Sequence, residues 1–173
     1  MDAFQIEFLR KEYRLWIEEL STDEIRAIKK YSYNSFDRRP NRFYERLNAM
    51  LRGQVTDERS KLSKYADIIS GAISKHTLLQ PIICYRGSAN DITEGFQIGD
   101  TIISDQFIST SLVESKAFAY KYRYTIYVPK GARGAYIEEI SHFPKQREFL
   151  IDRNTKLRLL SKYNNSVELE VIP

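Results

Sequence analysis

Residues 128–151 read VPKGARGAYIEEISHFPKQREFLI and join two strand-like runs through a loop rich in Ser, Pro and Lys. At the end of this loop an amide and a carboxylate, Gln146 and Glu148, stand one residue apart. On a strand both side chains would point to one face, while Arg147 would point to the other. The pair therefore predicts either a solvated strand edge or one wall of a polar site.

The hydrophobic pattern of the chain changes near residue 80. Before it, apolar residues recur at helical spacing, and STDE at 21–24 fits a capping box. After it, short runs rich in β-branched and aromatic residues often alternate. Helices followed by strands predict an α+β fold in one domain, residues 1–173, with a helical half at 1–79 and a strand-rich half at 80–173.

The expected elements can be given by residue. The first helix places Phe4, Phe8, Leu9, Leu15, Trp16 and Leu20 roughly along one face. A short helix is expected at 114–120. Strands are expected at 81–87, 105–112, 123–129, 134–140, 147–152, 155–162 and 167–172.

Composition excludes several classes of protein. The 173 residues are 42% hydrophobic and 29% charged, as in an ordered globular protein, and the net charge of +4 permits an anionic ligand without requiring one. A single cysteine, Cys84, excludes a disulfide framework within the chain, and with only two histidines it argues against a zinc site. The apolar runs are too short to span a bilayer, and the charged N-terminus lacks the apolar core of a signal peptide.

Three short polar motifs could carry chemistry. In YRG, Tyr85 to Gly87, the planar fork of Arg86 suits a phosphate and the glycine permits close approach of a ligand. In FISTSL, residues 107–112, three successive hydroxyls could bond to neighbouring side chains. The third motif is QREFL, residues 146–150. Each motif alone has an ordinary structural explanation, and no Walker or Rossmann loop and no supported Ser-His-Asp triad accompanies them.

Together and in this order, the motifs resemble the Arg-Ser-Glu class of mono-ADP-ribosyltransferases. LNAMLRG at 47–53 resembles the I-N-x-x-L-R-G helix end of that class, with Leu47 where Ile is usual. The likeness covers roughly residues 22–160. It implies N-terminal helices packed on a two-sheet β-core with a central NAD cleft, and a toxin-like transferase that uses NAD as co-substrate.

Within this class, Gln146 is informative, because arginine-modifying members usually carry Glu there. A Q-x-E motif with an aromatic residue three positions earlier, Phe143, resembles the clostridial Rho-modifying exoenzymes, which modify an asparagine. The resemblance implies transfer to an Asn or Gln side chain of a target protein, for which a small GTPase is a candidate. Gln146 offers a donor and an acceptor to such an amide, whereas an ionised Glu offers acceptors only.

The resemblance also implies roles for the other residues. Glu148 would bond to the ribose 2′-OH and offset positive charge as the glycosidic bond breaks. Ser109 would orient Glu148, Arg86 would bind the pyrophosphate, and the backbone at Gly87 would hold the nicotinamide amide, with Tyr85 beside it. No metal is expected, because no water needs activation.

Three further residues complete the predicted NAD site. Asn48 and Arg52, from the helix end, would contact the phosphates or the adenosine. Phe118 would pack near the nicotinamide, with Tyr120 as its rival.

Two alternatives remain open. Guanine-modifying, pierisin-like toxins also use Q-x-E, but the basic residues here are scattered, which makes nucleic acid the less favoured substrate. The other alternative is a non-catalytic module of the same fold, used for partner binding or in a phage particle. The expected place of action is a host cytoplasm after secretion or translocation, with a separate delivery component as a candidate partner, or the cytoplasm of the cell that makes the protein.

Overall fold

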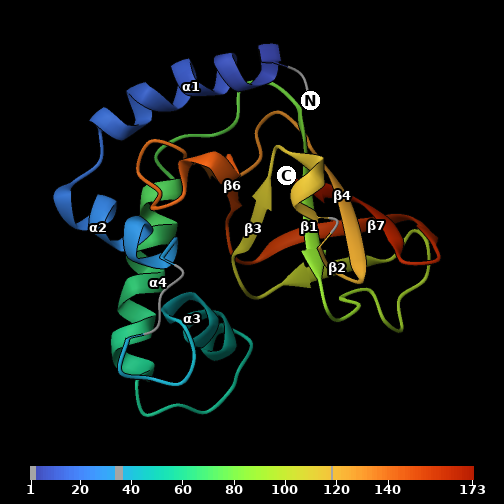
Figure 1. The fold of residues 1–173 in the computed structure, drawn as a ribbon, viewed down its shortest axis with the longest axis horizontal. Coiled ribbons are helices and arrows are strands. Elements are labelled where there is room, and N and C mark those ends of the chain that lie inside the picture. The colour runs from blue at the N-terminus through green and yellow to red at the C-terminus, as the bar shows by residue number, and fades with distance from the viewer. Residues whose placement is uncertain (1–2, 34–36, 118) are drawn as a thin grey trace.

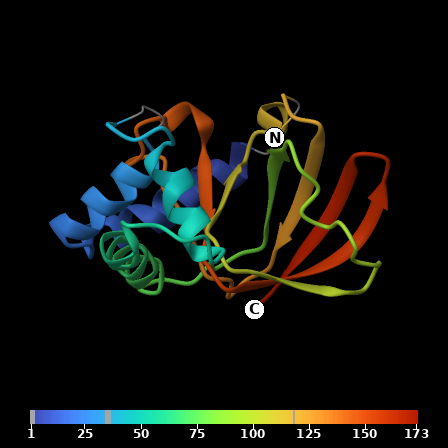
Figure 2. The same cartoon turned by 90° about the horizontal axis from the view of Figure 1, so that it is seen from below.

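The computed structural model describes residues 3–33, 37–117 and 119–173, which form four helices and an eight-stranded sheet. Figures 1 and 2 show the helices gathered beside β6 and β3, with β2, β7 and β8 at the opposite end of the sheet. The predicted α+β class is confirmed. The helices are α1 (Ala3–Glu18), α2 (Thr22–Tyr31), α3 (Phe43–Leu51) and α4 (Arg59–Ile73).

The buried face of α1 differs from the predicted one. Ile6, Leu9, Tyr13 and Trp16 are buried and follow the three- and four-residue spacing of a helix stripe. Phe4 and Leu15, which we expected on that face, are exposed by 85% and 65%. Position around the helix, and not apolar character alone, decides which side chains meet the core.

Two buried hydrogen bonds fix α1 on the rest of the molecule. The Tyr13 hydroxyl donates to the backbone oxygen of Gly134 over 2.9 Å, and the Trp16 indole donates to that of Ala72 over 2.8 Å. The first bond joins α1 to the sheet and the second joins it to α4. The predicted capping box at the start of α2 is also present, since Ser21 and Glu24 each bond to the other's backbone N–H.

The strands form one continuous sheet in the order β2-β7-β8-β4-β1-β3-β6-β5. All pairs are antiparallel except β4 with β8. A single residue pair, Tyr85 opposite Ser111, joins β1 to β3. This pair connects the group β2-β7-β8-β4-β1 to the group β3-β6-β5. The expected two-sheet core is thus a single sheet that is nearly divided at this point. The strands are β1 (Ile82–Ser88), β2 (Thr101–Ser104), β3 (Ile108–Ser111), β4 (Tyr122–Val128), β5 (Gly134–Tyr136), β6 (Glu148–Ile151), β7 (Thr155–Tyr163) and β8 (Ser166–Ile172).

The observed and expected elements differ in three places, apart from shifts in the end residues of strands. The sequence did not predict β2, a four-residue edge strand whose residues are half-buried or exposed. The expected strand at 134–140 ends at Tyr136, because the chain then turns and the N–H groups of Ile140 and Ser141 both bond to the oxygen of Ile137. The short helix is a 3₁₀ turn, Glu114–Ala117.

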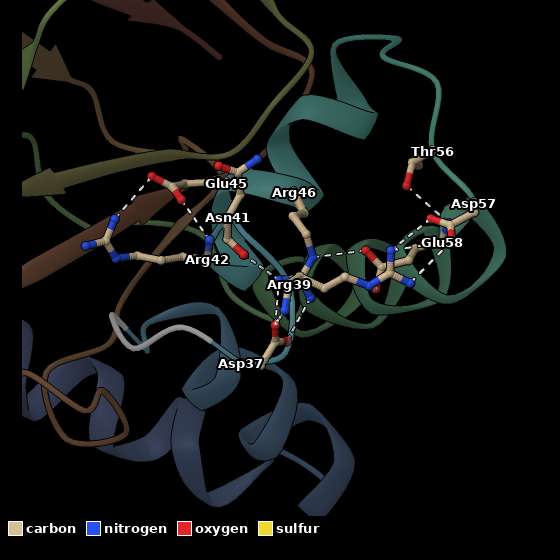
Figure 3. A network of polar contacts seen from close by, with 9 residues as sticks. All are labelled: Asp37, Arg39, Asn41, Arg42, Glu45, Arg46, Thr56, Asp57 and Glu58. Carbon is tan, nitrogen blue, oxygen red and sulfur yellow. Dashed lines mark hydrogen bonds and ion pairs between the residues drawn. The ribbon is translucent and has the colours of Figure 1, made fainter.

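A polar network fixes the segment that leads into α3 (Figure 3). The Arg46 guanidinium bonds to both carboxylate oxygens of Asp37, at 3.1 and 2.9 Å, and to Glu58 at 2.9 Å. The side chains of Arg46 and Glu58 are only 10% and 8% exposed. Because breaking a buried pair leaves an uncompensated charge, this network holds the first turn of α3 against the start of α4.

No helix in the described parts of the chain combines the length and hydrophobicity that a membrane span requires.

Candidate active site

A cavity of about 460 Å³ lies between the helices and the middle of the sheet. Its volume falls within the range of roughly 300–1,000 Å³ that small-molecule sites occupy. Its walls come from β1, β3, the start of β6, the 3₁₀ turn after β3, the end of α2 and the first turn of α3. The lining residues are Tyr31, Ser32, Tyr44, Glu45, Tyr85, Arg86, Gly87, Ser88, Ala89, Ser109, Thr110, Ser111, Lys116, Ala117, Tyr120, Phe143, Gln146 and Glu148.

In the wall of the cavity, a serine holds a buried carboxylate. The Ser109 hydroxyl donates to Oε1 of Glu148 over 2.6 Å, and Glu148 is 5% exposed. Ser109 lies opposite Leu150 in the β3–β6 pairing, so Glu148 is its diagonal neighbour on the same face. The spacing of the two motifs therefore produces this contact through ordinary strand geometry.

The other two hydroxyls of the Ser-Thr-Ser motif bond to the backbone at the start of β6. Thr110 donates to the oxygen of Phe149 over 2.5 Å, and Ser111 donates to that of Gln146 over 2.6 Å. All three side chains of the motif thus hold the segment that carries the Q-x-E residues.

Arg86 and burial act in opposite directions on Glu148. Nη1 of Arg86 donates to the backbone oxygen of Ser109 over 2.8 Å, which keeps the guanidinium at the cavity wall. Burial raises the pKa of Glu148 above its usual value, while the Ser109 hydrogen bond and the charge of Arg86 partly oppose that rise. Burial is the largest of these effects.

Gln146 reaches the cavity by a different route from the one expected. It ends a 3₁₀ turn, Pro144–Gln146, and does not lie on a strand. Arg147 then adopts the left-handed conformation, with φ 47° and ψ 54°. The predicted strand alternation is therefore wrong for Gln146, yet Gln146 and Glu148 still line one cavity.

Gly87 is required by packing against its own chain. A Cβ atom there would lie 2.5 Å from Cδ2 of Tyr120 and 2.8 Å from the backbone oxygen of Ala117. Tyr120, the rival candidate, also lines the cavity, whereas Phe118 lies outside the described residues. Tyr85, next to Gly87 on β1, lines the cavity as well.

The structure does not bring Asn48 and Arg52 into the cavity wall. Asn48 is buried, and its side-chain nitrogen donates to the Tyr31 hydroxyl over 2.9 Å, behind the lining layer. Its Oδ1 has no hydrogen-bond partner in the described structure. Arg52 ends α3 and donates to the side chain of Gln106.

Sequence reasoning missed several lining residues. Tyr31, Ser32, Tyr44 and Glu45 come from the helical half, where no motif marked them. Lys116 follows the Ser-Thr-Ser motif closely, and a cation so near a predicted phosphate site was a usable signal. Among the residues that the structure describes, no group of three or more His, Cys, Asp or Glu side chains is arranged to hold a metal ion.

The arrangement of arginine, serine and glutamate around one cavity can be compared with known proteins. The sequence profile of a family described as ADP-ribosyltransferase exoenzyme matches residues 5–170. The chain belongs to this exoenzyme family. The family membership expected from the motifs is thereby confirmed.

Two curated relatives of this exoenzyme domain are longer proteins. NAD(+)–arginine ADP-ribosyltransferase EFV of Enterococcus faecalis is 28% identical over 169 residues, which cover 90% of this chain and 32% of that protein. Mono(ADP-ribosyl)transferase SpvB of Salmonella typhimurium is 31% identical over 120 residues, which cover 64% of this chain and 20% of that protein. The chain thus spans about a third and a fifth of the relatives' lengths.

Solved structures support the fold of the exoenzyme domain. Plx2a, an ADP-ribosyltransferase toxin from Paenibacillus larvae, superposes with a TM-score of 0.79 at 23% identity, covering 96% of this chain and 94% of that one. The C3 exoenzyme of Clostridium limosum superposes with a TM-score of 0.75 at 21% identity, covering 97% of this chain and 95% of that one.

Proposed function

We propose that this exoenzyme domain transfers ADP-ribose from NAD to an Asn or Gln side chain of a target protein and releases nicotinamide. The observation that carries the proposal is the Ser109–Glu148 hydrogen bond beside Arg86, in a cavity of suitable volume. Membership of the exoenzyme family supports NAD as the co-substrate.

The residues around the cavity fit the parts of NAD. Arg86 and Lys116 provide cationic groups for a pyrophosphate, and Tyr85 and Tyr120 provide aromatic surface near them. Glu148 is an acceptor held at a fixed position, which suits a ribose hydroxyl.

The reaction breaks one bond and forms another at the same carbon. The bond from C1′ of the ribose to nicotinamide breaks, and its electron pair leaves with the nicotinamide. A bond forms from C1′ to the acceptor nitrogen, which loses one proton. Positive charge grows on the ribose as the first bond breaks, so the ionised carboxylate of Glu148 would stabilise the transition state more than the ground state.

Gln146 supports an uncharged acceptor. Its carbonyl end can accept and its amide nitrogen can donate, which matches the side-chain amide of Asn or Gln. Phe143, three residues earlier, lines the cavity, is 37% exposed and offers apolar surface to a target protein. We propose a small GTPase as the target class, reached in a host cytoplasm after secretion or translocation.

Arginine is the second candidate acceptor, because the enterococcal relative carries arginine in its name. Treating a host-cell lysate and purified Rho-class GTPases with the protein and NAD, followed by mass spectrometry, would identify the modified residue. An adduct on Asn or Gln supports the proposal, and one on Arg overturns the acceptor assignment. Label on guanine instead would favour a nucleic-acid-modifying enzyme, and no cleavage of NAD would favour a non-catalytic module.

A further inference from the structure

Ser32 and Tyr33, the two residues that follow α2, contact the loop that carries Phe143 and Gln146. The backbone N–H of His142 donates to the Ser32 hydroxyl over 3.1 Å, and that hydroxyl donates to the oxygen of Lys29 over 2.8 Å. The rings of Tyr33 and His142 lie 4.4 Å apart between centroids, with their planes tilted by 52°. Two independent contacts therefore join the start of this loop to the helical half.

The same loop is held at its other end by the sheet. The Ser111 hydroxyl donates to the backbone oxygen of Gln146 over 2.6 Å. Between the two attachments lie only Phe143, Pro144 and Lys145. The segment that presents Phe143 and Gln146 is thus fixed at one end by the Ser-Thr-Ser motif and at the other by Ser32 and Tyr33, just after α2.

The Ser111 attachment and the Tyr33 contact differ in their relation to the cavity. Ser111 belongs to the motif that also holds Glu148 through Ser109. Tyr33 is 42% exposed, does not line the cavity, and touches the loop through the ring of His142. Removing the Tyr33 ring would therefore take away one contact of the loop without removing a residue that lines the cavity.

We propose that Tyr33 is a positioning residue for the acceptor, which acts by holding His142 and thereby the placement of Phe143 and Gln146. The inference rests on the proposed transferase function. Because Tyr33 works through ring packing, its hydroxyl is dispensable. Packing of one aromatic pair is weak enough that its loss should change transfer by about 3- to 10-fold and leave the fold intact.

The test compares Tyr33→Ala and Tyr33→Phe with the wild-type protein. Tyr163→Ala is the matched control, because Tyr163 is 78% exposed at the end of β7. Nicotinamide release from NAD, label transfer to a Rho-class GTPase and to lysate protein, and hydrogen exchange of the peptide 141–147 are measured for each. The first readout tests the proposed function, and the other two test the role of Tyr33.

For Tyr33→Ala we expect NAD cleavage within about twofold of wild type, transfer lowered about 3- to 10-fold through a higher KM for the acceptor, and faster exchange in 141–147. Tyr33→Phe and Tyr163→Ala should behave as wild type. Equal losses of cleavage and transfer, or unchanged exchange, would overturn the inference. If wild-type protein cleaves no NAD, the proposed function fails, and the exchange measurement still decides whether Tyr33 holds the loop.

Discussion

The Ser109 hydroxyl and the Glu148 carboxylate are 2.6 Å apart, joined across neighbouring strands as diagonal partners. The bond orients a carboxylate that is 5% exposed, and it offsets part of the cost of burying that group. A carboxylate prepared in this way can respond to charge that develops on a substrate without first reorganising.

Removing the Ser109 hydroxyl should lower NAD cleavage. A hydrogen bond to a charged group contributes about 1.5–3 kcal/mol, so Ser109→Ala should reduce kcat by about 10- to 100-fold. Nicotinamide release under saturating NAD measures the effect, with Ser60→Ala, an exposed serine on α4, as the control. A kcat within twofold of wild type would mean that Ser109 does not support Glu148 in catalysis.

The raised pKa of Glu148 predicts an acidic limit to activity. If the ionised carboxylate is the active form, kcat should fall as the pH drops through a value above the usual 4.5 of a glutamate. Because the Ser109 hydroxyl lowers this pKa, Ser109→Ala should shift the acidic fall in kcat to higher pH. The pH profile of nicotinamide release is measured for wild type and for Ser109→Ala. If kcat falls at the same pH in both proteins, this prediction is wrong.

Glu148→Gln should stabilise the fold at neutral pH. A carboxylate whose pKa is raised on folding costs no stability below its unfolded pKa, and the cost grows as the pH rises towards the folded pKa. Above the folded pKa, the Gln variant should have a higher melting temperature than wild type. A gain of about 1 kcal/mol in the free energy of unfolding corresponds to about 2–4 °C. Melting curves should be recorded from about pH 4 to about pH 8, a range that spans the raised pKa values of buried glutamates. The difference in melting temperature between the variant and wild type should shrink towards acidic pH.

The Arg10–Glu138 pair should support stability with the opposite pH dependence. Arg10 donates to both oxygens of Glu138 at 2.8 and 2.9 Å, and these bonds are the main cause that lowers the pKa of Glu138. A lowered pKa gives stability that is present above the unfolded pKa and is lost as the pH falls. Glu138→Gln should therefore lower the free energy of unfolding by about 1–2 kcal/mol near pH 7. This loss is smaller than for a fully buried pair, because Arg10 is partly exposed to water, and it should be smaller still at acidic pH. Equal destabilisation at both pH values would argue against this pair.

Gln146→Glu should change which acceptor is used while sparing NAD cleavage. The substituted carboxylate offers acceptors only at neutral pH and suits a guanidinium. We expect cleavage within a few-fold of wild type, and transfer that moves from a side-chain amide to agmatine, a guanidino compound. Both are measured with labelled NAD, and parallel loss of cleavage and transfer would contradict the separate roles of Gln146 and Glu148.

Motif order, through the family resemblance, predicted that Arg86, Ser109 and Glu148 would lie around one cavity. Ser109, Glu148 and Arg86 lie on or beside paired strands, where period-two geometry converts sequence spacing into spatial position. Gln146 departed from that rule because Pro144 starts a 3₁₀ turn, after which the left-handed Arg147 redirects the chain. The proline was visible in the sequence, but the conformation of Arg147 depends on bonds made by its neighbours.

The helical wall of the cavity was beyond sequence reasoning. Tyr31 and Tyr44 reach the cavity because α2 and α3 pack beside β3, and helical spacing alone does not encode where a helix packs. Asn48 was expected at NAD from a motif likeness, yet it bonds to Tyr31 one layer behind the surface. Its Oδ1 is also buried and has no hydrogen-bond partner among the described residues.

Nicotinamide release by wild-type protein and by Glu148→Gln tests the central claim most directly. The account predicts steady release by the wild type and a loss of about 10²- to 10³-fold in the variant, the usual effect of removing one preorganised electrostatic group. The variant should remain folded, and NAD should still raise its melting temperature, because Arg86 and Tyr85 are unchanged. A Glu148→Gln protein that releases nicotinamide at the wild-type rate would contradict the account.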